Sequence, residues 1–236
     1  MYADDTMEYL PNGISLEIAS GTFPLSTDSM ALARFVKLPR NARVLDLGSG
    51  CGTLGLLLCA TDENCHVSGM ELEEKAHTTA LENIRRNRLN ARMKSICADL
   101  RLISDYFVPG SFDVCVSNPP YFSGGPASSS LPDARKELQC SLSDLITSAG
   151  KALKYGGDFF LVHRPERMAE IIALGSAHQL EAKRLLLLRH RESGPINLVL
   201  LQLRKGGKPG LKIEEAALFD SKGNPTAYHK AVYHTE

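Results

Sequence analysis

The stretch that decides the fold is Val44-Leu45-Asp46-Leu47-Gly48-Ser49-Gly50-Cys51-Gly52. Its first four residues have the apolar character of a buried strand, and the glycines that follow indicate a tight loop. The apolar run Leu54–Leu58 then opens a helix. A strand that leads through a glycine loop into a helix is typical of the first unit of a nucleotide-binding α/β sheet.

Strand and helix patterns continue to alternate along the chain. Four further strands follow, each linked by a helical or loop segment, and two more come at the end without an intervening helix. This order predicts an α/β, Rossmann-like fold: a seven-stranded, mostly parallel sheet with an antiparallel edge strand and helices on both faces. The later strands are expected at His66–Met70, Met93–Cys97, Phe112–Ser117, Asp158–His163, Leu185–Leu188 and Ile196–Leu203.

We expect residues 1–236 to form a single domain, because 236 residues with 43% hydrophobic content can build one large core. Residues 1–40 should form an N-terminal hairpin and a helix. Residues 41–205 should form the Rossmann-like core, and residues 206–236 a tail packed on that core.

Composition restricts the partners. The formal net charge is +0, so a nucleic-acid partner would need a local basic patch. The six cysteines show no CxxC pair and no metal-ligand spacing, which predicts reduced thiols, no metal centre and a cytoplasmic protein. There is no secretory signal and no long apolar run, so no membrane partner is expected. A monomer is expected.

Polar residues follow four of the predicted strands. Asp46, Glu71, Asp99 and Asn118 each stand at or just after a strand end. In a doubly wound sheet, ligands bind outside the carboxyl ends of the strands. These four side chains are therefore expected to line one crevice.

The glycine loop is compatible with two kinds of cofactor. Residues Gly50–Gly55 satisfy GxGxxG, and Glu71 lies at the sequence separation expected of a ribose-binding acid. A nicotinamide-dependent dehydrogenase is therefore one alternative. However, Asp46 would repel a neighbouring pyrophosphate, whereas a carboxylate suits an ammonium group. S-adenosyl-L-methionine carries an ammonium and a sulfonium and no phosphate. The pattern therefore favours a methyltransferase over a dehydrogenase.

A second motif, Asn118-Pro119-Pro120-Tyr121-Phe122, follows the strand at Phe112–Ser117. Its two prolines fix two φ angles and remove two backbone donors. Because Asn118 precedes a proline, helical backbone angles are disfavoured at Asn118. Rigid acceptors beside an aromatic ring suit a flat molecule that carries an amino group.

With both motifs placed, the chain resembles the class I methyltransferases that carry Asn-Pro-Pro-Tyr and modify adenine N6 or glutamine. Within these, it is similar to the bacterial tRNA N6-adenosine methyltransferases that modify adenosine 37 of valine tRNA. The resemblance also includes Phe23–Leu32 before the first motif, and Ala134-Arg135 with Glu137 after the second.

This resemblance implies methyl transfer from S-adenosyl-L-methionine to the exocyclic N6 amine of an unpaired adenine in the anticodon loop of a tRNA. The alternatives are a glutamine methyltransferase acting on a release factor, another RNA or DNA adenine methyltransferase, and a non-catalytic RNA-binding module. The release-factor enzymes carry a helical N-terminal domain that the short segment before the first motif does not match.

The motifs assign roles to single residues. The Asn118 side-chain oxygen and the Pro119 carbonyl would accept the two N–H bonds of the target amine, and Tyr121 would stack on the base. Glu71 would bind the cofactor's ribose hydroxyls, and Asp99 would either accept its adenine amine or cap a helix. The expected catalytic residues are Asn118, Pro119, Pro120 and Tyr121; the cofactor-binding residues are Thr27, Asp28, Asp46, Gly48, Ser49, Gly50, Gly52, Glu71, Leu72, Ala98, Asp99 and Asn118; the substrate-binding residues are Phe23, Tyr121, Phe122, Arg135 and Arg164.

Binding the rest of the RNA requires cations. The candidates are Arg85, Arg86 and Arg88, then Arg135 and Lys136, then Arg164 and Arg167, and finally Arg204, Lys205 and Lys208. A solvated helix face is the alternative for the Arg85 group. Residues 123–133 form a candidate lid over the base.

Overall fold

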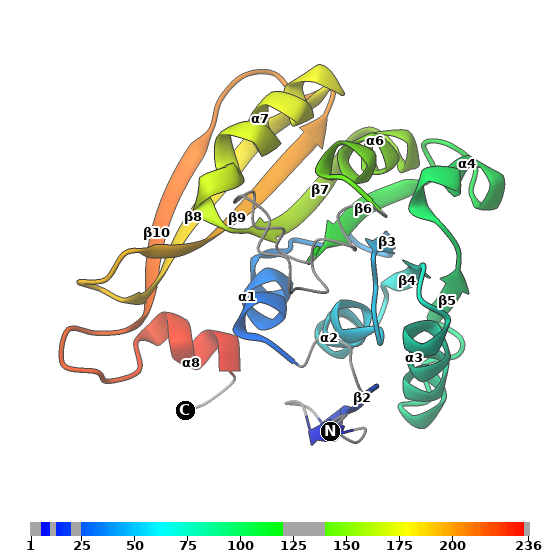
Figure 1. The fold of residues 1–236 in the computed structure, drawn as a ribbon, viewed down its shortest axis with the longest axis horizontal. Helices are drawn as coiled ribbons and strands as arrows, with labels where there is room; N and C mark the ends of the chain where they lie inside the picture. The colour runs from blue at the N-terminus through cyan, green and yellow to red at the C-terminus, as the bar shows by residue number, and fades with distance from the viewer. Residues whose placement is uncertain (1–5, 10–12, 20–24, 120–139, 234–236) are drawn as a thin grey trace, which may run out of the picture.

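The computed structural model describes residues 6–9, 13–19, 25–119 and 140–233. An eight-stranded sheet has the order β10-β8-β9-β7-β6-β3-β4-β5, and β1 and β2 form a separate hairpin (Figure 1). The strands are β1 Thr6–Tyr9, β2 Ser15–Ile18, β3 Arg43–Leu47, β4 His66–Glu71, β5 Met93–Cys97, β6 Phe112–Ser117, β7 Leu153–His163, β8 Leu180–Arg191, β9 Ile196–Lys205 and β10 Lys212–Phe219.

The predicted α/β, Rossmann-like class is confirmed, but the sheet differs from the prediction in two ways. It has eight strands rather than seven, because β10, which falls in the expected tail, pairs in parallel with β8. The antiparallel strand β9 lies inside the sheet, between β7 and β8, and not at its edge. The reason is visible in β9, where Leu198–Leu203 are all buried. A strand that is apolar on both faces belongs to the sheet interior.

Helices cover both faces of the sheet (Figure 1). Successive side chains of a strand point to opposite faces. On β3, Val44 joins the apolar cluster under α1 and α2, and Leu45 joins the cluster under α6 and α7. The helices of the first cluster are α1 Thr27–Phe35, α2 Thr53–Thr61, α3 Glu74–Arg86 and α8 Ala227–Tyr233; those of the second are α4 Ile103–Tyr106, α6 Leu142–Ala152 and α7 Met168–Ala177. Two short 3₁₀ helices, η2 Leu100–Leu102 and η3 Pro165–Arg167, follow β5 and β7.

Strand direction positions the site. Every strand of the large sheet except β9 points the same way, so the carboxyl ends of β3, β4, β5, β6 and β7 meet at one edge. The carboxyl end of β9 lies at the opposite edge. None of the helices in the described part of the chain is both long and apolar enough to cross a bilayer.

Candidate active site

Backbone hydrogen bonds tie the carboxyl ends of the neighbouring strands together. The N–H groups of Gly48 and Ser49 both donate to the carbonyl of Met70, at 2.9 and 3.2 Å. The N–H of Ala98 donates to the carbonyl of Glu71 at 2.8 Å. The Ser117 hydroxyl donates to the carbonyl of Leu47 at 2.7 Å. The expected crevice edge is therefore a connected structure, built from β3, β4, β5 and β6.

The glycine loop requires glycine at the points where it bends. Gly50 has a φ of +54° and Gly52 a φ of +86°, in the left-handed region that L side chains rarely adopt. Gly52 is also the residue from which α2 starts, and a Cβ there would lie 3.1 Å from Cε of Met93. The loop thus brings its backbone close to the sheet and to the start of α2.

Asp46 is the most unusual group of the site. It is 1% exposed, and neither carboxylate oxygen has a hydrogen-bond partner in the part of the chain that the structure describes. The pKa of Asp46 is raised to about 7, mainly by burial and also by the negative charge of Glu71, and the nearby backbone amide of Gly55 partly opposes this shift. A buried carboxylate without a partner is suited to bind a cationic group of a ligand.

Ser49 strengthens this interpretation. Its hydroxyl is also buried and without a hydrogen-bond partner among the described residues. It lies directly over β4, where a Cβ on Gly69 would approach its Oγ to 2.7 Å. The end of β3 and the loop after it therefore offer a carboxylate, from Asp46, and a hydroxyl, from Ser49, for a polar ligand. This fits an amino acid moiety with its ammonium group, and it does not fit a pyrophosphate.

Glu71 is held in place by two backbone donors. Its Oε2 accepts the N–H of Gly50 at 2.7 Å, and its Oε1 accepts the N–H of Glu73 at 2.9 Å. Each carboxylate oxygen keeps acceptor capacity for one further donor, which suits the two hydroxyls of a ribose. The next side chain, Leu72, is 45% exposed and offers an apolar surface for a flat ring. These residues fit S-adenosyl-L-methionine as predicted.

Asp99 makes the helix-cap contact that was the alternative to adenine binding. Its Oδ1 accepts the N–H of Arg101 at 2.9 Å, so the side chain caps η2. The Arg101 guanidinium contacts both carboxylate oxygens and lowers the pKa of Asp99. Its contact with the cofactor stays a prediction. Ala98, beside it, is buried with its N–H bonded to β4.

Asn118 is anchored by a residue that the sequence analysis did not identify. Its Nδ2 donates to the hydroxyl of Ser29 at 2.9 Å, and Ser29 is 6% exposed in the first turn of α1. The Ser26 hydroxyl caps the same turn by accepting the N–H of Ser29. No local pattern could reveal a contact across 89 positions.

The other predicted residues near α1 are placed differently. Thr27 hydrogen-bonds through its hydroxyl to the Tyr233 hydroxyl of α8, at 2.5 Å. Asp28 is half-buried in the first turn of α1. Their contact with the cofactor stays a prediction. Phe23, Pro120, Tyr121, Phe122, Arg135, Lys136 and the candidate lid 123–133 lie outside the described residues.

The candidate RNA-binding cations separate into two groups. Arg164 follows β7 at the crevice edge, where its guanidinium donates to the Asn197 carbonyl at 3.4 Å. Arg204 lies at the opposite edge, near the carboxyl end of β9, and pairs with Asp158 at 2.8 Å. The Arg204–Lys208 run therefore lies away from Asn118. Two further candidates are also paired, Arg86 with Glu17 and Arg167 with Glu170.

His163, the last residue of β7, is a second residue missed by sequence analysis. It is fully buried, and its Nδ1 accepts the N–H of Arg164 at 2.8 Å. The pKa of His163 is lowered to about 4, mainly by burial and also by the charge of Arg167. The imidazole is therefore neutral near pH 7, with its proton on Nε2. It supports the backbone at the start of the Arg164 segment.

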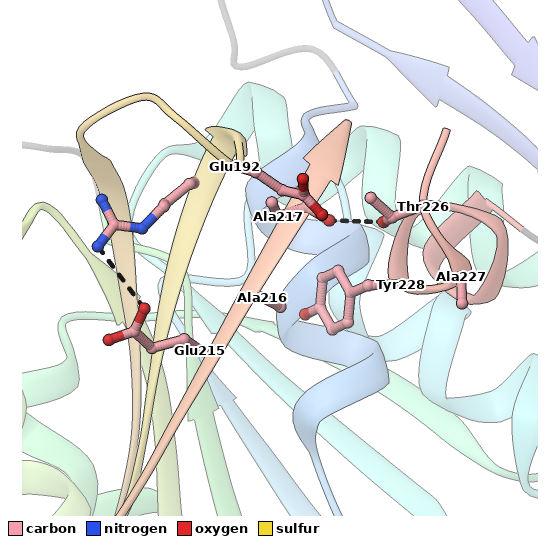
Figure 2. A pocket seen from close by; sticks show the side chains of 8 residues that line it. Glu192, Glu215, Ala216, Ala217, Thr226, Ala227 and Tyr228 are labelled. Atoms are coloured by element: carbon pink, nitrogen blue, oxygen red, sulfur yellow. Dashed lines mark hydrogen bonds and ion pairs between the residues drawn. The ribbon is translucent and has the colours of Figure 1, made fainter. Parts of the chain in front are cut away.

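A separate hollow of about 470 Å³ lies between β8, β10 and α8. In Figure 2, Glu215 lies on one side, with Thr226 and Tyr228 on the other. Glu215 forms an ion pair with Arg189 at 3.6 Å. The Thr226 hydroxyl donates to the carbonyl of Ala217 at 2.6 Å. None of the predicted site residues that the structure describes lines this hollow, so it is distinct from the strand-end edge with Asp46 and Asn118.

Solved structures of methyltransferases share the fold. A predicted O-methyltransferase from Agrobacterium tumefaciens matches with a TM-score of 0.74 at 22% identity, covering 88% of this chain and 96% of that one. The T. thermophilus 16S rRNA N2 G1207 methyltransferase, solved with AdoMet and guanosine, matches with a TM-score of 0.59 at 20% identity. That match covers 85% of this chain and 50% of the other. At these identities the likeness shows the fold alone.

The profile of the Methyltransferase small domain family matches residues 25–182. Together with the crevice, this match defines an S-adenosylmethionine-dependent methyltransferase with a Rossmann-like core. A tRNA1(Val) (adenine(37)-N6)-methyltransferase from Tolumonas auensis is 31% identical over 197 residues, which are 81% of this chain and 79% of the relative. The chain belongs to the family of these tRNA1(Val) (adenine(37)-N6)-methyltransferases. The similarly named relative from Actinobacillus pleuropneumoniae serotype 5b is 34% identical over 140 residues, which span 58% of either chain.

Proposed function

We propose that this chain transfers the methyl group of S-adenosyl-L-methionine to the exocyclic N6 amine of an unpaired adenine in RNA, and that its substrate is adenosine 37 in the anticodon loop of a tRNA. The observation that supports the proposal most directly is that two functional groups lie at the same edge of the sheet. β3 carries the buried, unpartnered carboxylate of Asp46, and the adjacent β6 ends at the anchored amide of Asn118.

The crevice residues supply binding and orientation. S-adenosyl-L-methionine supplies the electrophilic methyl group on its sulfonium. Asp46 and Ser49 would hold the ammonium end, Glu71 the ribose hydroxyls, and Leu72 the adenine. Because burial holds Asp46 and Ser49 and two backbone donors hold Glu71 before binding, little reorganisation of these groups is needed at the moment of transfer.

Asn118 and Pro119 would hold the acceptor. Nδ2 of Asn118 donates to Ser29, so Oδ1 is the amide atom that would accept an N–H of the target amine. The Pro119 carbonyl would accept the second N–H. Two such hydrogen bonds direct the nitrogen lone pair toward the methyl group. No side-chain nucleophile is needed, and the rate enhancement comes from positioning and electrostatics.

The energetics of base binding favour a loop over a duplex. Extruding a paired base costs a few kcal/mol. Stacking on Tyr121 would return roughly 1–3 kcal/mol, and each hydrogen bond about 0.5–1.5 kcal/mol. These amounts nearly cancel for a paired base, whereas a base that is already unpaired avoids most of the cost. Arg164 at the crevice edge would contact the RNA backbone. We further expect a cytoplasmic monomer.

The test is methyl transfer from tritiated S-adenosyl-L-methionine to tRNA that lacks the modification, followed by digestion to nucleosides. The expected product is N6-methyladenosine at position 37. Asn118→Ala should abolish transfer while leaving the affinity for S-adenosylhomocysteine within a few-fold. Label on a release factor and none on tRNA would favour the glutamine methyltransferase and overturn the proposal.

A matched pair of variants tests the RNA-facing edge. Arg164→Ala removes a cation at the crevice edge, and it should raise the KM for tRNA several-fold by removing a phosphate contact. Arg204→Ala removes a cation at the opposite edge, and it should leave that KM unchanged. An equal change in the KM for tRNA in the two variants would contradict the proposal that the RNA binds at the crevice edge.

A further inference from the structure

Asn83 connects two parts of the molecule that are distant in sequence. It lies on α3 and is 0% exposed. Its Oδ1 accepts the N–H of Glu17 in the N-terminal hairpin at 2.8 Å, and its Nδ2 donates to the carbonyl of Glu17 at 2.8 Å. The same Nδ2 donates to the carbonyl of Cys51 in the glycine loop at 3.0 Å.

The orientation of this amide is fixed by its partners. The backbone N–H of Glu17 can only donate, so it must face the oxygen of Asn83. The carbonyls of Glu17 and Cys51 can only accept, so both must face the nitrogen. An isosteric aspartate could satisfy the first contact but would place an oxygen against two carbonyls. The site is therefore specific for a side-chain amide.

Asn87, the residue that caps the carboxyl end of α3, makes the same kind of contact with the hairpin. Its Oδ1 accepts the N–H of Ser15 at 3.0 Å, and its Nδ2 donates to the Ser15 carbonyl at 2.7 Å and to the Asn83 carbonyl at 2.8 Å. The two asparagines thus pair with β2 as a neighbouring strand would. Of these two side chains, Asn83 is the one that also contacts the glycine loop.

Cys51 lies at the centre of the cofactor loop. The residue before it, Gly50, donates its N–H to Glu71, and the residue after it, Gly52, starts α2. Cys51 is buried in a small cluster with Ala19, just after β2, and with Ala76 on α3. The hairpin, α3 and the glycine loop therefore meet around the Cys51 carbonyl.

We propose that Asn83 is a positioning residue that couples the docking of the N-terminal hairpin to the conformation of the cofactor-binding glycine loop. The inference rests on the proposed function, because it assumes that S-adenosyl-L-methionine binds this loop. Coupling between two sites is reciprocal. Docking of the hairpin therefore strengthens cofactor binding, and cofactor binding protects the hairpin by the same factor.

The experiment compares Asn83→Ala with Asn87→Ala. Both variants lose two hydrogen bonds to the hairpin, so both should lower Tm, Asn83→Ala by the larger amount because Asn83 is fully buried. Only Asn83→Ala also releases the Cys51 carbonyl. Losing one such hydrogen bond corresponds to a rise of roughly three- to tenfold in the calorimetric Kd for S-adenosylhomocysteine. Asn87→Ala should leave this Kd within about twofold. The KM for S-adenosyl-L-methionine should follow the Kd, with kcat unchanged.

Hydrogen exchange on the wild-type protein tests the coupling without a substitution. Saturating S-adenosylhomocysteine should slow exchange of the Glu17 amide by roughly the same three- to tenfold factor. Unchanged exchange at Glu17 on ligand binding would overturn the coupling. Equal Kd values for the two variants would overturn the role of Asn83.

A third measurement separates this inference from the proposed function. In the ligand-free protein, the Gly50 and Gly52 amides should exchange faster in Asn83→Ala than in Asn87→Ala. If the wild-type protein bound no S-adenosylhomocysteine, the proposed function would fail and the cofactor coupling with it. The ligand-free comparison would then still support or overturn the mechanical link between hairpin and loop.

Discussion

Replacing Asp46 with asparagine should make the ligand-free protein more stable and the cofactor bind more weakly. Burial and the charge of Glu71 raise the pKa of Asp46 from its usual 3.8 to about 7. Between these two pH values the folded protein holds a proton that the unfolded chain has lost. Stability therefore falls as pH rises from about 4 to about 7, and it levels off above pH 7.

The shift from 3.8 to about 7 sets the size of the effect. At 1.36 kcal/mol per pKa unit, ionised Asp46 destabilises the ligand-free protein by about 4 kcal/mol above pH 7. Asp46→Asn removes the charge but leaves a buried amide without partners, at a cost of about 1–3 kcal/mol. The net gain expected at pH 8 is about 1–3 kcal/mol, measurable as a higher Tm or a higher denaturant midpoint.

Cofactor binding should show the opposite response, because an ammonium group requires the ionised carboxylate. At pH 6 only about a tenth of Asp46 is ionised, so the Kd for S-adenosylhomocysteine should be roughly tenfold weaker than at pH 8. Calorimetry at pH 6 in buffers of different ionisation enthalpy should detect release of about one proton. Asp46→Asn should weaken binding at pH 8 by about 10- to 100-fold, since hydrogen bonds to charged groups are worth about 1.5–3 kcal/mol.

Two results would refute this reasoning. One is a wild-type Kd that is the same at pH 6 and pH 8. The other is an Asp46→Asn variant that keeps the wild-type pH dependence, because the titrating group would then be elsewhere. The matched control is Asp113→Asn. The Asp113 carboxylate accepts the Arg43 N–H, and its pKa is lowered through contact with Lys154 and Arg43 despite partial burial. This substitution should leave the pH dependence of binding unchanged.

Three other substitutions test the remaining parts of the crevice. Ser29→Ala removes the hydrogen bond that anchors the Asn118 amide. It should lower kcat for tRNA methylation by about 3- to 10-fold and leave the cofactor Kd unchanged. An unchanged kcat would contradict the anchoring role. Glu71→Gln removes the negative charge beside the buried Asp46 carboxylate, so the pH midpoint of cofactor binding should shift to a lower pH. The Kd at pH 8 should rise. Calorimetry measures both quantities. Gly69→Ala would bring a Cβ to 2.7 Å from the Ser49 hydroxyl, so it should displace that side chain and weaken binding of S-adenosylhomocysteine; a wild-type Kd would show that Ser49 does not contribute.

The sequence could predict the crevice residues because parallel strands share a direction. Once Asp46, Glu71 and Asn118 are each assigned to a strand end, their meeting at one edge follows from topology alone. The sequence could not reveal which side chains hold them. Ser29 reaches Asn118 across 89 positions, and Asn83 reaches Glu17 across 66, so neither contact leaves a local pattern. Such contacts depend on how the helices pack over the sheet.

Strand direction also explains the errors in the sheet and in the basic residues. The apolar run that became β9 identified a strand but not its position, since a hairpin partner of β8 can pair on either side. Its place between β7 and β8 is decided by burial on both faces. Because β9 runs opposite to its neighbours, Arg204 falls at the edge away from the crevice. A cluster of basic residues in the sequence therefore indicates an RNA contact only when the direction of its strand in the sheet is known.

The crevice residues that suit cofactor binding are unfavourable for the stability of the ligand-free fold. Among the described residues, Asp46 and Ser49 are buried without hydrogen-bond partners, so each destabilises the ligand-free protein. Folding alone would favour an asparagine or an apolar residue at position 46. Both residues become favourable when one ligand supplies an ammonium group and a hydrogen-bonding partner, and the exposed Leu72 gains apolar contact when the same ligand supplies a flat ring. A ligand that removes both costs should stabilise the fold strongly, so S-adenosylhomocysteine should raise Tm much less in Asp46→Asn than in the wild-type protein.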